Sequence, residues 1–162
     1  YMSEVIKVGM ADLNVCKAPD VITTLGLGSC IGLVLYDPVT KVGGMVHYML
    51  PDSTKIRQNQ NKLKFADTGI QALVEELEKQ GLSRKNMIAK IAGGAKMFQF
   101  SSDTAMGNIG EKNVEAVREV LKQYGIKIVS EDVGLNYGRT IVFDPVTKDL
   151  TVVTAGKQTH II

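Results

Sequence analysis

The chain of 162 residues is long enough to form one domain with a hydrophobic core, without help from metals or disulfides. Its 44% hydrophobic and 22% charged residues are ordinary for a globular protein, and a net charge of +2 gives no general attraction for nucleic acid or anionic membranes. We expect a single domain over residues 2–162. No signal peptide, membrane-spanning run or lipidation motif is visible, so we expect a cytoplasmic location and no membrane insertion.

Runs of β-branched and apolar residues dominate the first third and predict strands over residues 5–10, 21–25, 31–36 and 42–49. Apolar residues at helical spacing then predict one helix from Asp67, as its cap, to Gln80 and another from Glu111 to Tyr124, each followed by glycine. Shorter runs predict strands over residues 87–92, 126–129, 140–143 and 150–153. This mixture predicts an α+β fold with two packed β-sheets, sandwich-like and with mixed strands, and two main helices packed on one side.

A glycine-punctuated segment between two predicted strands ends in a cysteine: Thr24-Leu25-Gly26-Leu27-Gly28-Ser29-Cys30. A thiol on such a turn can present its sulfur at the edge of a sheet, where small residues leave room for a substrate. Taken alone, burial of Cys30 as a small hydrophobic residue is an equally good interpretation. The other cysteine, Cys16, has no glycine turn or histidine near it, and we expect it to be a packing residue.

The turn Asp37-Pro38-Val39-Thr40 predicts that the two strands beside it form a hairpin. With this four-residue loop, Tyr36 faces Lys41 and Cys30 lies opposite His47, with Cβ atoms about 5 Å apart. Two glycines in the second strand can host a bulge, and a shift of one residue would put Cys30 and His47 on opposite faces. A thiol beside an imidazole is the pair needed to form a thiolate near neutral pH.

Two other site classes fit the sequence poorly. A zinc site from Cys16, Cys30, His47 and His160 would lack the short paired spacings of structural zinc ligands, so we expect no metal. A dinucleotide fingerprint starting at Gly26 would need a further glycine where Ile31 stands, and a helix where the sequence indicates a strand. We therefore expect no cofactor.

Seven blocks of sequence carry a resemblance to a known family: Thr24–Cys30, Tyr36–Gly44, His47–Asp52, Phe65–Thr68, Lys90–Phe98, Asn108–Val117 and Ser130–Thr140. In this order, over nearly the whole chain, they resemble the bacterial chemoreceptor glutamine deamidases, the CheD family. The resemblance implies a protein-glutamine glutaminase, a cysteine hydrolase that converts specific receptor glutamines to glutamates. It also implies that Cys30 is the nucleophile, His47 the base and Thr24 the residue that supports the histidine.

The chemistry that we expect begins when His47 takes the Cys30 proton and the thiolate attacks the glutamine carbonyl. Backbone N–H groups around Gly28, Ser29 and Cys30 would stabilise the oxyanion, and ammonia would leave behind a thioester that water hydrolyses. A glutamyl methyl ester would suit the same route, so methylesterase activity is a secondary expectation. Without the family, a structural hairpin histidine is the preferred interpretation of His47.

The resemblance names two protein partners: the cytoplasmic helices of chemoreceptors, as substrate, and the CheC phosphatase of chemotaxis. The alternative function is therefore a non-catalytic binding module that regulates this phosphatase. Phe98 and Phe100 share one face of an extended segment before a polar loop, so they are either partner-binding anchors or ordinary core residues. The polar stretch from Pro51 to Lys64 either flanks the active site or is a solvated loop.

Overall fold

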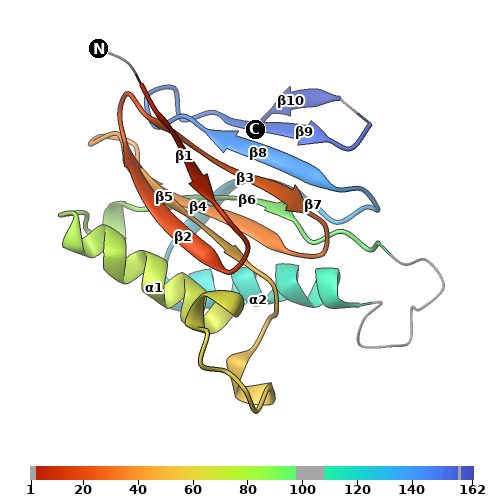
Figure 1. The fold of residues 1–162 in the computed structure, drawn as a ribbon. Coiled ribbons are helices and arrows are strands. Elements are labelled where there is room, and N and C mark those ends of the chain that lie inside the picture. Colours follow the sequence, from red (N-terminus) through yellow and green to blue (C-terminus); the bar gives the residue numbers. More distant parts are fainter. Residues whose placement is uncertain (1–2, 98–107, 157) are drawn as a thin grey trace.

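Three layers make up the molecule in the computed structural model, which describes residues 3–97, 108–156 and 158–162: two five-stranded sheets face each other, and two helices cover the outer face of one sheet (Figure 1). This arrangement confirms the predicted α+β sandwich with both main helices on one side. No helix in the described part of the chain has the length and apolar character needed to span a bilayer.

Each sheet combines antiparallel pairs with one parallel pair. The first sheet has the order β1 (Val5–Val8), β3 (Val21–Leu27), β8 (Arg139–Phe143), β9 (Leu150–Thr154) and β10 (Thr159–Ile161). The second has the order β2 (Asp12–Lys17), β5 (Val42–Tyr48), β4 (Ile31–Asp37), β6 (Ile88–Gly93) and β7 (Lys127–Val133). The helices are α1 (Ala66–Lys79) and α2 (Ile109–Tyr124), with short 3₁₀ turns at η1 (Ser53–Lys55), η2 (Lys62–Lys64) and η3 (Arg84–Asn86).

The second sheet is buried on both faces, and this explains why every residue of β4 is buried. Leu33 and Leu35 of β4 pack under the helices, whereas Val34 and Tyr36 pack between the sheets. Side chains alternate along a strand, so even-numbered positions near Val34 face the first sheet. By the same rule His47 of β5, which lies between Val46 and Tyr48 of the helix-side core, also faces the first sheet.

The hairpin of β4 and β5 forms, but its register differs from the predicted one. Its loop is Pro38–Lys41, with Lys41 at φ 59°, so Tyr36 pairs with Gly43 and His47 pairs with Gly32. The loop starts one residue later than predicted, so each residue of β4 pairs with a residue of β5 two positions beyond the predicted one. Side chains alternate between the two faces with a period of two, so every side chain stays on the predicted face. The glycines of β5 do not form a bulge with β4. A Cβ on Gly43 would lie 2.9 Å from Cβ of Tyr36, so close packing requires glycine there.

The other differences lie at the ends of elements and at sheet edges. The strand predicted over residues 5–10 is shorter in the structure, where it covers Val5–Val8. The sequence did not predict β2 and β10, because both lie at a sheet edge, where a strand buries fewer apolar side chains and its sequence pattern is weaker. The N-cap position of α1 is Phe65 rather than Asp67. Asp67 instead accepts hydrogen bonds from the backbone N–H and the hydroxyl of Ser53, which ties the preceding loop to the helix.

Candidate active site

Cys30 lies on the turn between β3 and β4, where a second glycine turn holds its backbone in place. Its carbonyl oxygen accepts a hydrogen bond from the Gly94 N–H at 2.9 Å, and the Gly28 carbonyl accepts one from the Ala95 N–H at 2.9 Å. Gly93 has φ 112°, and a Cβ there would lie 2.2 Å from the Cys30 carbonyl oxygen. Only glycine permits this approach. The turn after β6 therefore fixes the position of the cysteine.

The half-buried Cys30 opens on a pocket of about 310 Å³. The other residues that line it are Ser29, Met49, Leu50, Lys64, Ala95, Met97 and Ile109. This volume admits a single side chain such as a glutamine carboxamide, with a mostly apolar wall around it. The buried Cys16 lies in the core between the sheets, as expected of a packing residue, and burial, with Asp20 and Asp144 nearby, raises the pKa of its thiol to about 12.

The His47 imidazole is held in one orientation by Thr24 of the other sheet, with 2.8 Å between Nδ1 and the threonine Oγ1. The same hydroxyl lies 2.7 Å from the carbonyl oxygen of Val8 in β1. A hydroxyl has one proton, and a carbonyl oxygen can only accept, so the Thr24 proton goes to Val8. Thr24 must therefore accept from Nδ1–H, and this leaves the other ring nitrogen, Nε2, with a free lone pair.

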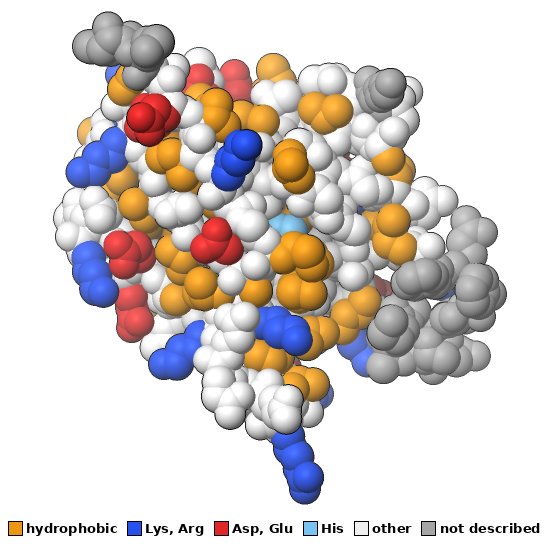
Figure 2. Space-filling view, viewed as in Figure 1, with side chains coloured by type: hydrophobic (Ala, Val, Ile, Leu, Met, Phe, Trp, Pro, Cys, Tyr) orange, Lys and Arg blue, Asp and Glu red, His pale blue; other side chains and the backbone are white. Residues whose placement is uncertain are grey.

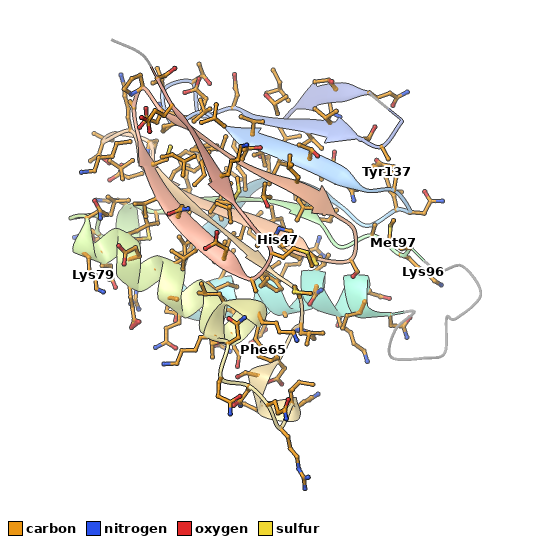
Figure 3. The ribbon with its side chains drawn as sticks, viewed as in Figure 1. His47, Phe65, Lys79, Lys96, Met97 and Tyr137 are labelled. Carbon is orange, nitrogen blue, oxygen red and sulfur yellow. The ribbon has the colours of Figure 1, made fainter. Side chains whose placement is uncertain are left out.

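That free nitrogen has no hydrogen-bond partner among the described residues, although the whole side chain of His47 is buried. In Figure 3 the labelled residue lies in the interior, between the strands of the two sheets, and Figure 2, in the same view, shows histidine only as a small pale-blue patch that neighbouring atoms largely cover. A buried polar atom without a partner is costly in a folded protein. The lone pair of Nε2 is therefore free to accept a proton, as the base role that the resemblance implies requires.

Cys30 and the imidazole lie on the same face of the second sheet. Cys30 precedes Gly32, the partner of His47, by two residues, and it packs against the core between the sheets. Regular sheet geometry, continued from β4 into the turn, makes such residues diagonal neighbours at a Cα separation of about 7–8 Å. A Cβ on Gly32 would lie 2.7 Å from Cδ1 of Ile141 and 3.5 Å from Cγ2 of Thr24. Glycine at this position therefore lets β3 approach closely enough for the Thr24 hydroxyl to reach the histidine.

Burial favours the neutral form of both the Cys30 thiol and the His47 imidazole. It raises the pKa of the Cys30 thiol, a shift that its own backbone N–H opposes, and it lowers the pKa of His47. Thr24 carries no negative charge that could stabilise an imidazolium. A neutral thiol and a neutral imidazole are therefore favoured at rest.

Asn113 of α2 joins the cysteine turn to the end of the histidine strand. Its fully buried amide group donates to the carbonyl oxygens of Ser29, at 2.8 Å, and of Met49, at 2.9 Å. The Tyr48 hydroxyl donates to the Asn113 backbone carbonyl. Sequence reasoning missed this residue. The available signal was an asparagine four residues before Val117, on the face of α2 that is otherwise apolar.

Comparison with known proteins identifies the family of this chain. The family model described as CheD chemotactic sensory transduction matches residues 49–154. A relative in Lachnoclostridium phytofermentans, named probable chemoreceptor glutamine deamidase CheD, is 61% identical over 96% of this chain and 97% of its own. One in Halalkalibacterium halodurans, named chemoreceptor glutamine deamidase CheD, is 52% identical over 94% of this chain and 95% of its own. This chain belongs to the CheD family.

Membership of the CheD family confirms the assignment that the seven sequence blocks predicted. In the structure the three residues to which that resemblance gives catalytic roles come from β3, β5 and the turn before β4. Gly28 and Ser29 lie on that turn and are half-buried. The predicted partner-binding residues Phe98 and Phe100 lie outside the described residues. Lys64, at the end of the long polar stretch, lines the pocket, so this stretch does flank the site.

Proposed function

We propose that this chain deamidates specific glutamine side chains on chemoreceptor cytoplasmic helices through a thioester on Cys30. Relatives named chemoreceptor glutamine deamidase support the substrate. The observation that carries the mechanism is the unpaired Nε2 of His47. The contacts of Thr24 with Val8 and with Nδ1 set the tautomer of this histidine, whose side chain lies on the same sheet face as Cys30. A base with a free lone pair next to a thiol is the arrangement that cysteine hydrolases need.

In the first half of the reaction, His47 Nε2 takes the proton of the Cys30 thiol as sulfur attacks the side-chain carbonyl carbon of glutamine. The negative charge moves to the carbonyl oxygen, where backbone N–H groups at Gly28, Ser29 and Cys30 stabilise it. The imidazolium then gives its Nε2 proton to the amide nitrogen. Ammonia leaves with the electron pair of the broken C–N bond, and a glutamyl thioester remains.

In the second half His47 again acts first as base and then as acid, with water as the nucleophile and sulfur as the leaving group. His47 Nε2 takes a proton from water as the water oxygen attacks the thioester carbon, and the C–S bond breaks. The departing sulfur regains a proton from the imidazolium, so the products are glutamate and the free thiol. Thr24 accepts from Nδ1–H throughout, since its own proton is committed to the Val8 carbonyl. A glutamyl methyl ester would pass through the same thioester with methanol as leaving group, and this supports a secondary methylesterase activity.

Binding to the CheC phosphatase is the further role that membership of the family supports. A catalytic enzyme and a regulator of a phosphatase can coexist in one chain, and the alternative is that only the regulatory role exists here. Replacement of Cys30 separates the two, because the thiol is needed for the thioester and not for a protein interface. We expect Cys30→Ala to retain phosphatase binding in a titration and to lose deamidation.

The test is mass spectrometry of chemoreceptor cytoplasmic fragments before and after incubation with the protein. Deamidation replaces –NH₂ by –OH at a glutamine, and the mass change in a peptide names the site. Cys30→Ala should give no change, and Cys16→Ala, which alters the buried thiol outside the pocket, should act like the wild type. Equal activity of both variants, or no mass change with the wild type, would refute the proposed function.

A further inference from the structure

A groove of about 750 Å³ lies beside the Cys30 pocket on the surface. The residues that line it are Leu50, Pro51, Asp52, Lys55, Ile56, Asp67, Ile109, Lys112, Glu115, Ala116, Glu119, Val120 and Gln123. Leu50 and Ile109 line both this groove and the Cys30 pocket. The two hollows are therefore neighbours at these two side chains, and a molecule that lies in the groove has the Cys30 pocket beside it.

One wall of the groove is the outer flank of α2. Its lining residues recur every three or four positions from Ile109 to Gln123, which is one side of the helix over nearly four turns. At 1.5 Å per residue the wall is about 21 Å long. A second helix of about four turns is the element that matches this length.

The other wall is the segment between β5 and α1, which leaves the sheets and runs past α2 in Figure 1. Hydrogen bonds within this segment hold it in shape. The Asp67 carboxylate accepts from Ser53, the Asp52 carboxylate accepts from the N–H and hydroxyl of Thr54, and the Asn59 amide donates to the Ser53 carbonyl. Both walls are thus preformed. They offer side chains to a ligand and no unpaired strand edge, so they suit a helix better than an added strand.

The chemistry of the groove is that of a helix-binding surface. Ala116 and Val120 form an apolar floor, and Ile56, 41% exposed, lies on the facing wall. Charged side chains of both signs, among them Lys112 and Glu119, lie along the same helix flank. An amphipathic helix pairs with such a surface through an apolar stripe at i, i+3, i+4 and i+7, with charges on either side of it.

We propose that this groove holds the chemoreceptor helix that carries the substrate glutamine, an inference that rests on the proposed function. The glutamine enters the Cys30 pocket at the end marked by Leu50 and Ile109. Apolar residues one, two and three turns away on the same helix face then pack between α2 and Ile56. The helix register on this surface selects which glutamine reaches the thiol, so the groove accounts for site specificity.

The test measures KM for a receptor fragment in two groove variants. Ile56→Asp removes the apolar side chain of one wall, and Ala116→Gln places a longer polar side chain on the floor. Ile56 is 41% exposed, so a docked helix would bury less than half of its side chain, and we expect KM for a receptor fragment to rise about three- to eightfold. Alkylation of Cys30 by iodoacetamide should proceed at the wild-type rate, because this small reagent does not use the groove. Val39→Asp is the matched control, since Val39 is 84% exposed on the loop at the far end of the β4–β5 hairpin.

Unchanged KM in both groove variants would overturn the proposal. The proposal would also be overturned if KM stayed the same while self-association, measured by light scattering, or the affinity for the phosphatase changed. The groove would then hold another occupant. Binding of the receptor fragment to Cys30→Ala protein, with and without Ile56→Asp, is measured separately. If the wild type does not deamidate the fragment, the proposed function fails, and this binding measurement still decides whether the groove holds the helix.

Discussion

The role of Asn113 is open to a direct test through Asn113→Leu, a change that keeps the side-chain size and removes both donors. The carbonyl oxygens of Ser29 and Met49 would each lose a buried partner, at a cost of about 1–3 kcal/mol apiece. Part of this is offset, because the Oδ1 atom of Asn113, which is buried without a partner in the described structure, disappears as well. We expect a net loss of about 1–4 kcal/mol in the free energy of unfolding.

We expect Asn113→Leu to lose activity even where the variant is still fully folded. Asn113 joins the turn that carries Cys30 to the end of the strand that carries His47, and a misplacement of about 1 Å between reacting groups can cost about 10²-fold in rate. We therefore expect kcat for a receptor fragment to fall by about 10²-fold with little change in KM. The alkylation rate of Cys30 should fall in parallel, because the base no longer lies beside the thiol.

Val117→Ala is the matched control for this experiment. Val117 is fully buried on the same face of α2, one turn farther along, and its truncation costs about 2 kcal/mol by leaving a cavity. It has no hydrogen bond to the cysteine turn, so kcat should stay within about twofold of the wild type below the melting temperature. If Asn113→Leu melts lower and yet keeps wild-type kcat, then α2 stabilises the fold without positioning the site.

Other substitutions and the pH dependence test the individual atoms of the site. Cys30→Ser should abolish deamidation and Cys16→Ala should leave it nearly unchanged, and the same rate in both would contradict the thioester. His47→Ala should cost about 10²-fold or more in kcat/KM, and retention of the rate would show that another group is the base. Thr24→Val, which cannot accept from Nδ1–H, should lower kcat about tenfold or more, whereas Thr24→Ser should retain most of it, and equal rates would exclude the tautomer argument. Because burial lowers the pKa of His47, the imidazole stays neutral to below pH 6.5, and the acid limb of kcat/KM should fall below that pH. Because burial raises the pKa of the Cys30 thiol, its alkylation rate should still rise above about pH 8.5, and a thiolate absorbance at pH 7 would refute the neutral pair.

Burial of His47 also links stability to pH. Its pKa in the folded state lies below that in the unfolded chain, so between these two values the unfolded chain binds more protons. The contribution of the neutral imidazole is fully present above about pH 6.5 and is lost as the pH falls toward the folded-state value. Denaturant unfolding of the wild type should therefore show a decline in stability over this range that His47→Gln lacks, and the same decline in both would assign it to other groups.

Local patterns predicted the central elements well and the edges poorly. The apolar run of β4 and the helical spacing of α1 are strong signals, because both elements bury a continuous face. The strand β2 carries polar residues on an edge of its sheet, where pairing with β5 rather than its own pattern determines its structure. The register of the hairpin depended on Lys41 in the left-handed region and on close packing at Gly43, and neither can be read from periodicity.

The sequence by itself determined the candidates for the reacting groups and predicted that they share a face. The glycine turn ending at Cys30, the alternation that puts this cysteine and His47 on one side of a hairpin, and the ordered family blocks all lie in local or linear patterns. Only the tertiary structure decided how the imidazole of His47, the proposed base, is held. The Thr24 hydroxyl comes from the opposite sheet, its proton goes to the carbonyl of Val8, and the clamp on the cysteine turn comes from Asn113 on a distant helix. These contacts join segments far apart in the chain, and their geometry exists only once the two sheets and the helix layer have packed together.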